Sequence, residues 1–321
     1  MCSIAPVATR TRNGCKLDYM GSLSSWARLD KFFRFAPPIF VSKMISMVKE
    51  LLTYINHHLD AEISLDSLSA LTGYSPFYIH RKFKEQTGET LGSFLQHQRI
   101  STAAYLLTLT TLPVSEIKFL VGYQTDSSFS KAFRNVMKVS PRLYRANNNY
   151  SKSLSKIRKA DYLSLNHEIH VFPERKAIVF PSIGNYFTKE IYNVWKEVDR
   201  YLSVNQLAVD NFEYYGILHS CQNLTPNLPG RFDAVIVPKP GVELATNKFF
   251  QSSVPGGRFV KYKFCCPVKQ FRNLSIAIGK HMEDKGLQHG SGISYFKYDS
   301  LPNYQNPDYQ FIEWYMPLEN Q

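Results

Sequence analysis

The 321-residue sequence lacks any apolar run that approaches the ~18 residues a membrane-spanning helix needs. Its N-terminal segment, Met1–Met20, also lacks the continuous apolar core of a secretory signal peptide. The five cysteines show no metal-binding spacing, since the adjacent Cys265 and Cys266 do not form a CxxC pair. We therefore expect a soluble, cytoplasmic protein with free thiols, no metal, no cofactor and no membrane partner.

Acidic residues are too few to balance the basic ones. There are 26 Asp and Glu against 38 Lys and Arg, and the formal net charge is +12. Such a balance is typical of proteins that bind polyanions. The densest excess falls in residues 1–43, where seven basic and two acidic residues leave +5. Net charge alone is therefore weak support for DNA binding, and the placement of the basic side chains matters more.

Residues 1–43 differ in texture from the rest of the chain. They combine Gly, Ser, Pro and scattered basic residues with little periodicity, which predicts a poorly ordered extension. Translation that starts at Met44 or Met47 is the alternative, and it would remove this segment. The length of the chain and its 44% of hydrophobic residues indicate two domains with packed cores.

Residues 44–147 carry apolar side chains at helical spacing and contain an internal repeat. The segment Leu68–Tyr74 resembles Ile117–Tyr123, and in each copy a short apolar helix ends at a glycine. Ser75 and Thr125 are suited to cap the second helix of the two copies. A short helix, a glycine turn and a capped second helix form a helix-turn-helix, so we predict an all-α domain with two such units.

The second helix of each unit is expected to lie in the major groove of double-stranded DNA. Arg81 can make a bidentate contact with guanine and Phe77 can touch a thymine methyl group, whereas Lys84 is better suited to a phosphate. The candidate DNA-binding residues surround the apolar stripe of the two helices: Phe77, Tyr78, His80, Arg81 and Lys84 in the first, and Asp126, Ser127, Ser128, Lys131 and Arg134 in the second.

The most specific motif of this region comprises Gly122-Tyr123, Phe129, Ala132-Phe133-Arg134 and Ser140-Pro141-Arg142-Leu143-Tyr144-Arg145. With this motif, residues 48–145 resemble the DNA-binding domain of AraC/XylS-type transcription regulators. The resemblance implies a long helix between the two units and base contacts from both second helices. Members of that family often carry glutamine where Asp126 and Ser127 stand. We therefore expect the second unit to read sequence weakly and to contact mainly phosphates.

The C-terminal half has a different texture. Residues 148–167 are polar and basic and predict a linker, while short β-type runs and helical stretches alternate over residues 168–321. The segment Phe172–Phe180 aligns with Val254–Tyr262, and each half closes with a strand that ends in proline. We predict an α+β domain of two tandem strand-helix-strand-strand modules around a shared cleft.

The two closing strands differ in one informative way. Three residues share a face in the first: Phe232, Ala234 and Ile236. The matching face of the second is expected to carry Phe311, Glu313 and Tyr315, so that Glu313 replaces an alanine between aromatic rings. An uncompensated carboxylate is costly to bury, and a cationic lipophilic ligand would compensate it. A salt bridge to a nearby lysine is the alternative.

Gly184-Asn185-Tyr186, Arg231-Phe232-Asp233-Ala234 and the glutamate in the last strand resemble GyrI-like effector-binding domains. The resemblance implies that Glu313 lies in a central cleft, and Tyr186 and Trp195 are further candidates for its lining, with a core position as the alternative. An AraC-type head with such a tail resembles transcription activators of the right-origin-binding type. It implies promoter DNA, RNA polymerase and a small hydrophobic or cationic effector as partners.

Glu313 is the one attractive candidate for catalysis, and it is accompanied by no triad and no metal-binding set. We therefore do not expect an enzyme. Two alternatives stay open for the tail: a hydrolase of small electrophiles with Glu313 as the base, and a module that only docks a partner protein. Since the head carries both reading helices, we expect a monomer on DNA, associated with the nucleoid.

Overall fold

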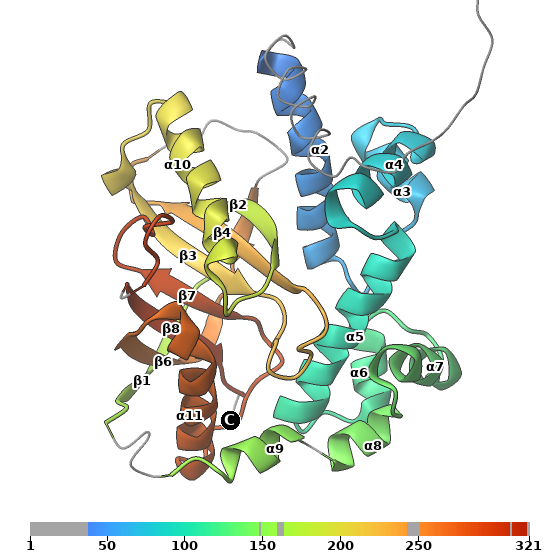
Figure 1. Ribbon diagram of the computed structural model, residues 1–321, viewed down its shortest axis with the longest axis vertical. Coiled ribbons are helices and arrows are strands. Elements are labelled where there is room, and N and C mark those ends of the chain that lie inside the picture. The colour runs from blue at the N-terminus through green and yellow to red at the C-terminus, as the bar shows by residue number, and fades with distance from the viewer. Residues whose placement is uncertain (1–37, 148, 159–163, 243–250, 309, 320–321) are drawn as a thin grey trace, which may run out of the picture. The chain divides into compact units, whose positions relative to one another are not determined.

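The computed structural model describes residues 38–147, 149–158, 164–242, 251–308 and 310–319. They form a helical region followed by a curled antiparallel sheet with two packed helices (Figure 1). The predicted N-terminal extension, up to residue 37, lies outside the described residues. The predicted order of an all-α region and an α+β region is confirmed.

Seven helices are described between residues 38 and 147: α2 (Pro38–His57), α3 (Leu65–Thr72), α4 (Pro76–Thr87), α5 (Leu91–Leu109), α6 (Val114–Leu120), α7 (Asp126–Met137) and α8 (Pro141–Ala146). Helices α3 and α4 form the first helix-turn-helix, and α6 and α7 form the second. The long helix α5 joins the two units, as the repeat and the resemblance imply.

Local sequence signals determine where these helices begin and end. The hydroxyl of Ser75 accepts a hydrogen bond from the backbone N–H of Tyr78 at 3.3 Å, and Thr125 caps α7 in the same way. Gly73 and Gly122 have φ angles of 74° and 79°, the left-handed conformation that glycine adopts without steric cost. The predicted caps and turns are therefore confirmed.

Each helix-turn-helix unit has its own apolar core. Ile79 and Phe83 of α4 are fully buried with residues of α2, α3 and the start of α5. Phe129 and Phe133 of α7 are equally buried with residues of α6 and the end of α5. Because these pairs are four residues apart, they fix which side of each second helix faces inward and which side faces solvent.

Paired arginines strengthen the repeat. The guanidinium of Arg99 donates to the backbone carbonyl of Leu59 at 2.9 Å, and that of Arg145 donates to the carbonyl of Leu107 at 3.1 Å. Arg99 on α5 thus holds the chain just after α2, and Arg145 on α8 holds the end of α5. These charge-assisted bonds satisfy carbonyl groups that a helix end leaves without an intrahelical partner.

The sheet contains eight described strands: β1 (His167–Phe172), β2 (Arg175–Gly184), β3 (Phe212–Leu218), β4 (Gly230–Pro238), β5 (Gln251–Val254), β6 (Gly257–Cys265), β7 (Ser294–Tyr298) and β8 (Phe311–Pro317). Their order is β1-β6-β8-β7-β3-β4-β2-β5, with antiparallel pairing throughout. Seven were predicted from their apolar runs, whereas the short, polar β5 was missed.

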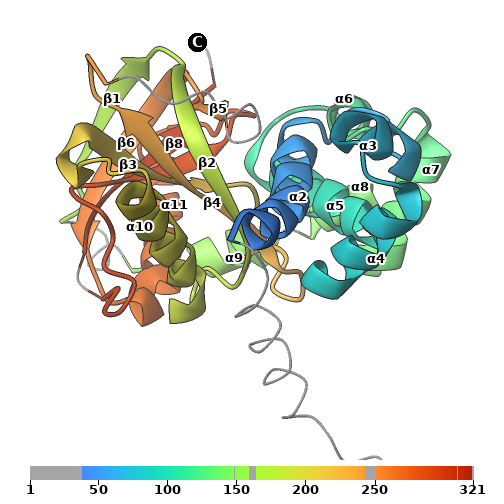
Figure 2. The same cartoon turned by 90° about the horizontal axis from the view of Figure 1, so that it is seen from above.

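Two helices, α10 (Val194–Val204) and α11 (Phe271–Asp284), pack on the same face of this sheet (Figure 2). Trp195 of α10 and Phe271 of α11 belong to one apolar core with Phe232 of β4. The opposite face carries a second core that contains Tyr215, Tyr295 and residues of the outer strands. The sheet therefore has a helix-covered face and a tyrosine-rich face.

The closing strands β4 and β8 differ from the predicted correspondence. On β4, Phe232 and Ala234 point to the helix-covered face, as expected. On β8 that face carries Ile312 and Trp314, so Glu313 and Tyr315 point to the tyrosine-rich face. The expectation that Glu313 replaces Ala234 is wrong. Both residues stand four positions before the proline that closes their strand, but they point to opposite faces of the sheet.

The predicted linker, residues 148–167, contains a short helix, α9 (Asn149–Leu154). Its Tyr150 lies against the backbone of α11 at Gly279, where any side chain would collide with the tyrosine ring. Leu154 is buried as well. Part of this basic segment is thus packed on the sheet region, while residues 148 and 159–163 lie outside the described residues.

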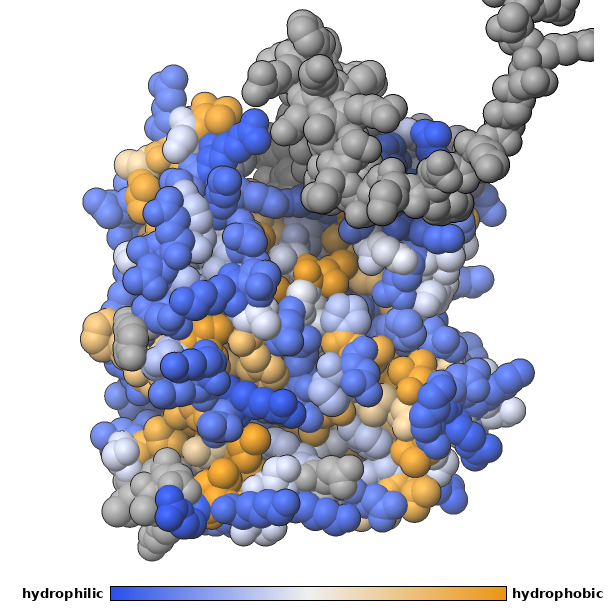
Figure 3. Space-filling view, in the orientation of Figure 1, coloured by the Kyte–Doolittle hydropathy of each residue, from blue (hydrophilic) through white to orange (hydrophobic). Residues whose placement is uncertain are grey.

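The surface view in Figure 3 shows a face that is mostly hydrophilic, with smaller hydrophobic patches between the polar side chains. Scattered apolar patches of this kind are normal on folded proteins and do not by themselves mark an interface. Among the described helices, none combines the length and the apolar character required to cross a bilayer.

Candidate nucleic-acid interface and effector site

The outer side of α4 presents the side chains that the sequence predicted for the first unit. Phe77 is 75% exposed, and Arg81 and Lys84 are exposed beside it. Tyr78 and His80 are half-buried, and the Arg81 guanidinium lies 5.8 Å from the centre of the Tyr78 ring. The buried stripe of Ile79 and Phe83 therefore leaves apolar, aromatic and cationic groups on a surface that can enter a groove of DNA.

The outer side of α7 is more constrained. The carboxylate of Asp126 accepts a hydrogen bond of 2.7 Å from the ammonium group of Lys118 on α6. The hydroxyl of Ser128 lies 2.8 Å from that of Thr125 and donates to the Thr125 carbonyl. Two of the five candidate residues on this helix thus take part in local structure.

The remaining candidates on α7 are Ser127, Lys131 and Arg134, and all three are exposed. Lys131 and Arg134 lie one turn apart, so both cations project from neighbouring positions of the helix. Lys and Arg side chains are common donors to DNA phosphates, and they also contact guanine edges. The division of roles between the two units stays a prediction.

On the tyrosine-rich face of the sheet, Glu313 is surrounded by partners from its own domain. The Tyr315 hydroxyl donates to its carboxylate at 2.9 Å, and the ammonium groups of Lys261 and Lys263 lie at 3.7 and 3.9 Å. Lys297 stands directly opposite Glu313 on β7. The carboxylate is thus balanced by lysines, which corresponds to the salt-bridge alternative of the sequence analysis.

A second carboxylate on this face is balanced in the same way. Glu213 accepts hydrogen bonds from Arg175 at 2.6 Å and Lys297 at 2.7 Å. Burial disfavours its charged form, but hydrogen bonds from Lys297 and Tyr215 outweigh it and lower the pKa of Glu213. The rings of Tyr295 and Tyr315 stack nearby, 5.0 Å apart. This face is therefore aromatic and ion-paired.

The other predicted lining residues do not gather at Glu313. Phe311 lies on the same strand but is 57% exposed, whereas Trp195 is fully buried in the core under α10. Tyr186 belongs to that core too, and its hydroxyl lies 3.0 Å from the hydroxyl of Ser220. The structure brings together Glu313 and Tyr315, and it places Tyr186 and Trp195 on the opposite, helix-covered face.

A buried polar cluster joins β4 to the helical region. Its Arg231 and Asp233 belong to a motif named from the sequence, but their contacts with α2 and α5 were not predicted. The Arg231 guanidinium donates to the side chains of Asn56 on α2, at 2.9 Å, and Thr102 on α5, at 3.2 Å. The carboxylate of Asp233 accepts a hydrogen bond from the side-chain amide of Asn56 at 3.2 Å. It also lies 2.6 Å from the Nε2 atom of His219. The signal was present in β4, where an arginine and an aspartate interrupt an apolar strand.

Burial lowers the pKa of Arg231 to about 10, while Tyr186 and Asp233 act in the opposite sense. The guanidinium therefore stays charged at neutral pH. Asp233 is completely buried, so its carboxylate depends on the surrounding donors for the solvation that water would otherwise provide. The cluster is thus a specific polar contact between the sheet and the two helices that support the first helix-turn-helix.

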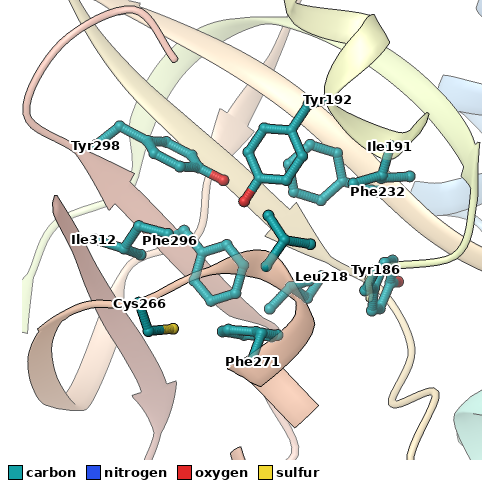
Figure 4. Close-up of a pocket in the computed structure, with 11 residues that line it drawn as sticks. Tyr186, Ile191, Tyr192, Leu218, Phe232, Cys266, Phe271, Phe296, Tyr298 and Ile312 are labelled. Carbon is teal, nitrogen blue, oxygen red and sulfur yellow. The ribbon is translucent and has the colours of Figure 1, made fainter. Parts of the chain in front are cut away.

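A small cavity of about 20 Å³ lies between the sheet, the 3-10 helix Lys189–Asn193 and the start of α11 (Figure 4). Aromatic rings form most of its wall, among them those of Phe232, Phe271 and Phe296. The hydroxyl groups of Tyr192 and Tyr298 lie close together at its edge. The size of this cavity suits at most one or two water molecules.

The helix-turn-helix domain family matches residues 68–147. The chain is 35% identical to the transposon Tn10 TetD protein of Escherichia coli over 102 residues, which are 32% of this chain and 74% of that protein. It is 31% identical to the regulatory protein SoxS of E. coli over 99 residues, 31% of this chain and 92% of SoxS.

The transcriptional regulator Rob of Salmonella typhimurium is 32% identical over 105 residues, 33% of this chain. The match spans 36% of Rob, so only about a third of the length of that relative is represented. TetD and SoxS, by contrast, are matched over most of their length. The family model covers the part of the chain that folds into α3–α8. The chain therefore belongs to the AraC/XylS family of DNA-binding, helix-turn-helix transcription regulators.

Proposed function

We propose that this protein is a transcription activator that binds an asymmetric promoter site as a monomer, with residues 44–147 as its DNA-binding domain. The observation that carries the proposal is that α4 and α7 both keep their polar faces exposed while their apolar faces are buried. Two reading helices on one chain suit adjacent major-groove segments about 34 Å apart. RNA polymerase is the proposed protein partner, on the nucleoid in the cytoplasm.

We also propose that residues 168–321, which follow the basic linker 148–167, form a GyrI-like effector-binding domain built from two tandem modules. The order β2, α10, β3, β4 is repeated by β6, α11, β7, β8. In the sheet these strands are arranged symmetrically about the β7–β3 pair, with three strands of one set on each side. This symmetry supports a duplicated module.

The effector that these surroundings favour is small and hydrophobic. A cationic effector at Glu313 would compete with Lys261 and Lys263, which already lie within 4 Å of the carboxylate. The Arg231 cluster offers a physical connection by which events in the sheet domain would reach α2 and α5. Modulation requires that the effector bind two states of the protein with different affinity.

Transcription in vitro with purified bacterial RNA polymerase tests the activator role. The full chain should raise transcript yield from a promoter that it protects in footprinting, and Arg81→Ala should lower both effects. A protein that protects the promoter but leaves the yield unchanged or reduced would refute activation. For modulation, identical footprints and yields with and without a panel of lipophilic neutral and cationic compounds would argue against the effector role.

A further inference from the structure

We propose that a second cavity, enclosed by α5, α9, α11 and the loop Cys221–Thr225, binds a small, uncharged organic molecule that donates and accepts hydrogen bonds. The inference rests on the proposed effector function and gives the effector a site away from Glu313. The residues that carry the argument line this cavity: Tyr105, Tyr150, Cys221, Asn223, His289 and Trp314.

The cavity is large enough for a guest. Its volume is about 60 Å³, several times the ~10–15 Å³ that a single water needs. It shares Tyr186, Leu218 and Phe271 with the smaller aromatic cavity of Figure 4. The two are therefore neighbours, and a shift of one shared ring would extend the larger cavity into the smaller one.

The wall of this cavity is neutral. Among the described residues that line it there is no Asp, Glu, Lys or Arg. Burial lowers the pKa of His289 to about 4 and raises the pKa of the Cys221 thiol to about 11, so both side chains are uncharged at neutral pH. Burying an ion among neutral groups is strongly unfavourable, and such a wall selects uncharged guests.

The wall also offers hydrogen-bonding groups of both kinds. The buried atoms without a hydrogen-bond partner among the described residues include the indole Nε1 of Trp314, the Oδ1 of Asn223 and the Nδ1 of His289. The indole N–H is a donor and the amide oxygen is an acceptor. Buried polar groups that lack partners cost free energy. The cavity should therefore bind a guest that has both a donor and an acceptor more tightly than it binds a hydrocarbon.

An entry route lies beside α9. Tyr150 and Asn223 line this cavity and also an open groove of about 480 Å³ next to α8. The Tyr150 ring lies against the backbone of Gly279 on α11. Rotation of this one tyrosine would join groove and cavity.

The loop Cys221–Thr225 connects the cavity to the DNA-binding domain. Thr225 and Ser101 of α5 are 3.1 Å apart at their hydroxyl oxygens, and the Tyr144 hydroxyl of α8 donates to the Leu224 carbonyl at 3.1 Å. The Tyr144 ring packs edge-to-face on Phe133 of α7, with 5.3 Å between the ring centres. A guest that displaces this loop would therefore act on the second reading helix.

The test uses isothermal titration of the full chain with three probes of similar shape: benzyl alcohol, benzylammonium and benzoate. Benzyl alcohol should bind at least about tenfold more tightly than either ion, because the wall contains no counter-charge. Cys221→Leu, which fills the cavity, should abolish this binding, while the matched variant Cys265→Leu at an exposed cysteine should not. Equal affinity for all three probes, or binding unchanged in Cys221→Leu, would overturn the proposal.

A conservative second variant guards against misfolding of the first. Trp314→Phe keeps an aromatic ring and removes the indole donor, and it should weaken benzyl alcohol binding about 2- to 10-fold. Circular dichroism should show that this variant is folded. An unchanged affinity would contradict the assigned hydrogen bond.

Titration of operator DNA separates this inference from the proposed function. Benzyl alcohol binding that depends on Cys221 but leaves DNA affinity unaltered supports the site and counts against effector modulation through it. A lipophilic compound that alters DNA affinity equally in the wild type and in Cys221→Leu supports modulation and overturns this site.

Discussion

Replacement of Arg231 by methionine tests whether the buried polar cluster holds the sheet against the DNA-binding domain. The change removes hydrogen bonds to Asn56 and Thr102 and withdraws a positive charge from near Asp233, which is completely buried. Removal of one partner from a buried ionic group costs about 3–5 kcal/mol, because the other charge is left without compensation. We expect a loss of that size in the free energy of unfolding.

The assay is urea denaturation followed by circular dichroism, with Arg200→Met on the exposed side of α10 as the matched control. The control should change stability by less than about 0.5 kcal/mol. Adding Asp233→Asn to Arg231→Met removes the stranded charge and should recover part of the loss. If Arg231→Met is no more destabilising than Arg200→Met, the cluster does not stabilise the fold and the reasoning fails.

Gly73 and Gly122 occupy equivalent turns, but a methyl group at Gly73 would meet no atom within 4 Å, whereas one at Gly122 would meet the Leu59 carbonyl and Arg99. In thermal unfolding, Gly73→Ala should lower the free energy of unfolding by about 1–2 kcal/mol, because alanine is strained in the left-handed conformation. Gly122→Ala should lower it by about 1–3 kcal/mol more, because its methyl group also collides with its neighbours. Equal losses in the two variants would contradict the packing. Arg81→Ala should cost about 1–3 kcal/mol at the best DNA site and relax one base position; a uniform loss over all sequences would make Arg81 a phosphate contact. Because burial lowers the pKa of His289 from 6.5 to about 4, the unfolded chain binds a proton that the folded chain does not, and stability should fall by about 2–3 kcal/mol between these pH values. His289→Asn should remove that part of the pH dependence in urea titrations, and an unchanged slope would speak against a buried neutral ring.

Most of the fold could be predicted because its signals are local. The caps at Ser75 and Thr125 and the turns at Gly73 and Gly122 depend only on neighbouring residues. The apolar runs of seven strands are equally visible in the sequence. The strand β5, Gln251–Val254, was missed because it is short and polar and pairs only at the edge of the sheet.

The candidate sites were less predictable because they depend on register and on contacts between distant residues. Alignment of the closing prolines does not determine which face a side chain takes, and a shift of one residue moved Glu313 to the other face of the sheet. Asn56 and Arg231 are 175 positions apart, so no local pattern links them. The engagement of Asp126 by Lys118 likewise depends on how α6 packs against α7.

The central claim, that one chain reads DNA through α4 and α7, is tested most directly by selection of binding sites from a random DNA library with the full-length protein. The account predicts an enriched asymmetric site with two recognised segments about one helical turn, ~10 base pairs, apart. Arg81→Ala should weaken the base preference at one position of the better-defined segment. Lys131→Ala should lower the affinity for DNA with little change in the selected sequence. Enrichment of a symmetric palindrome, or of no sequence at all, would contradict it.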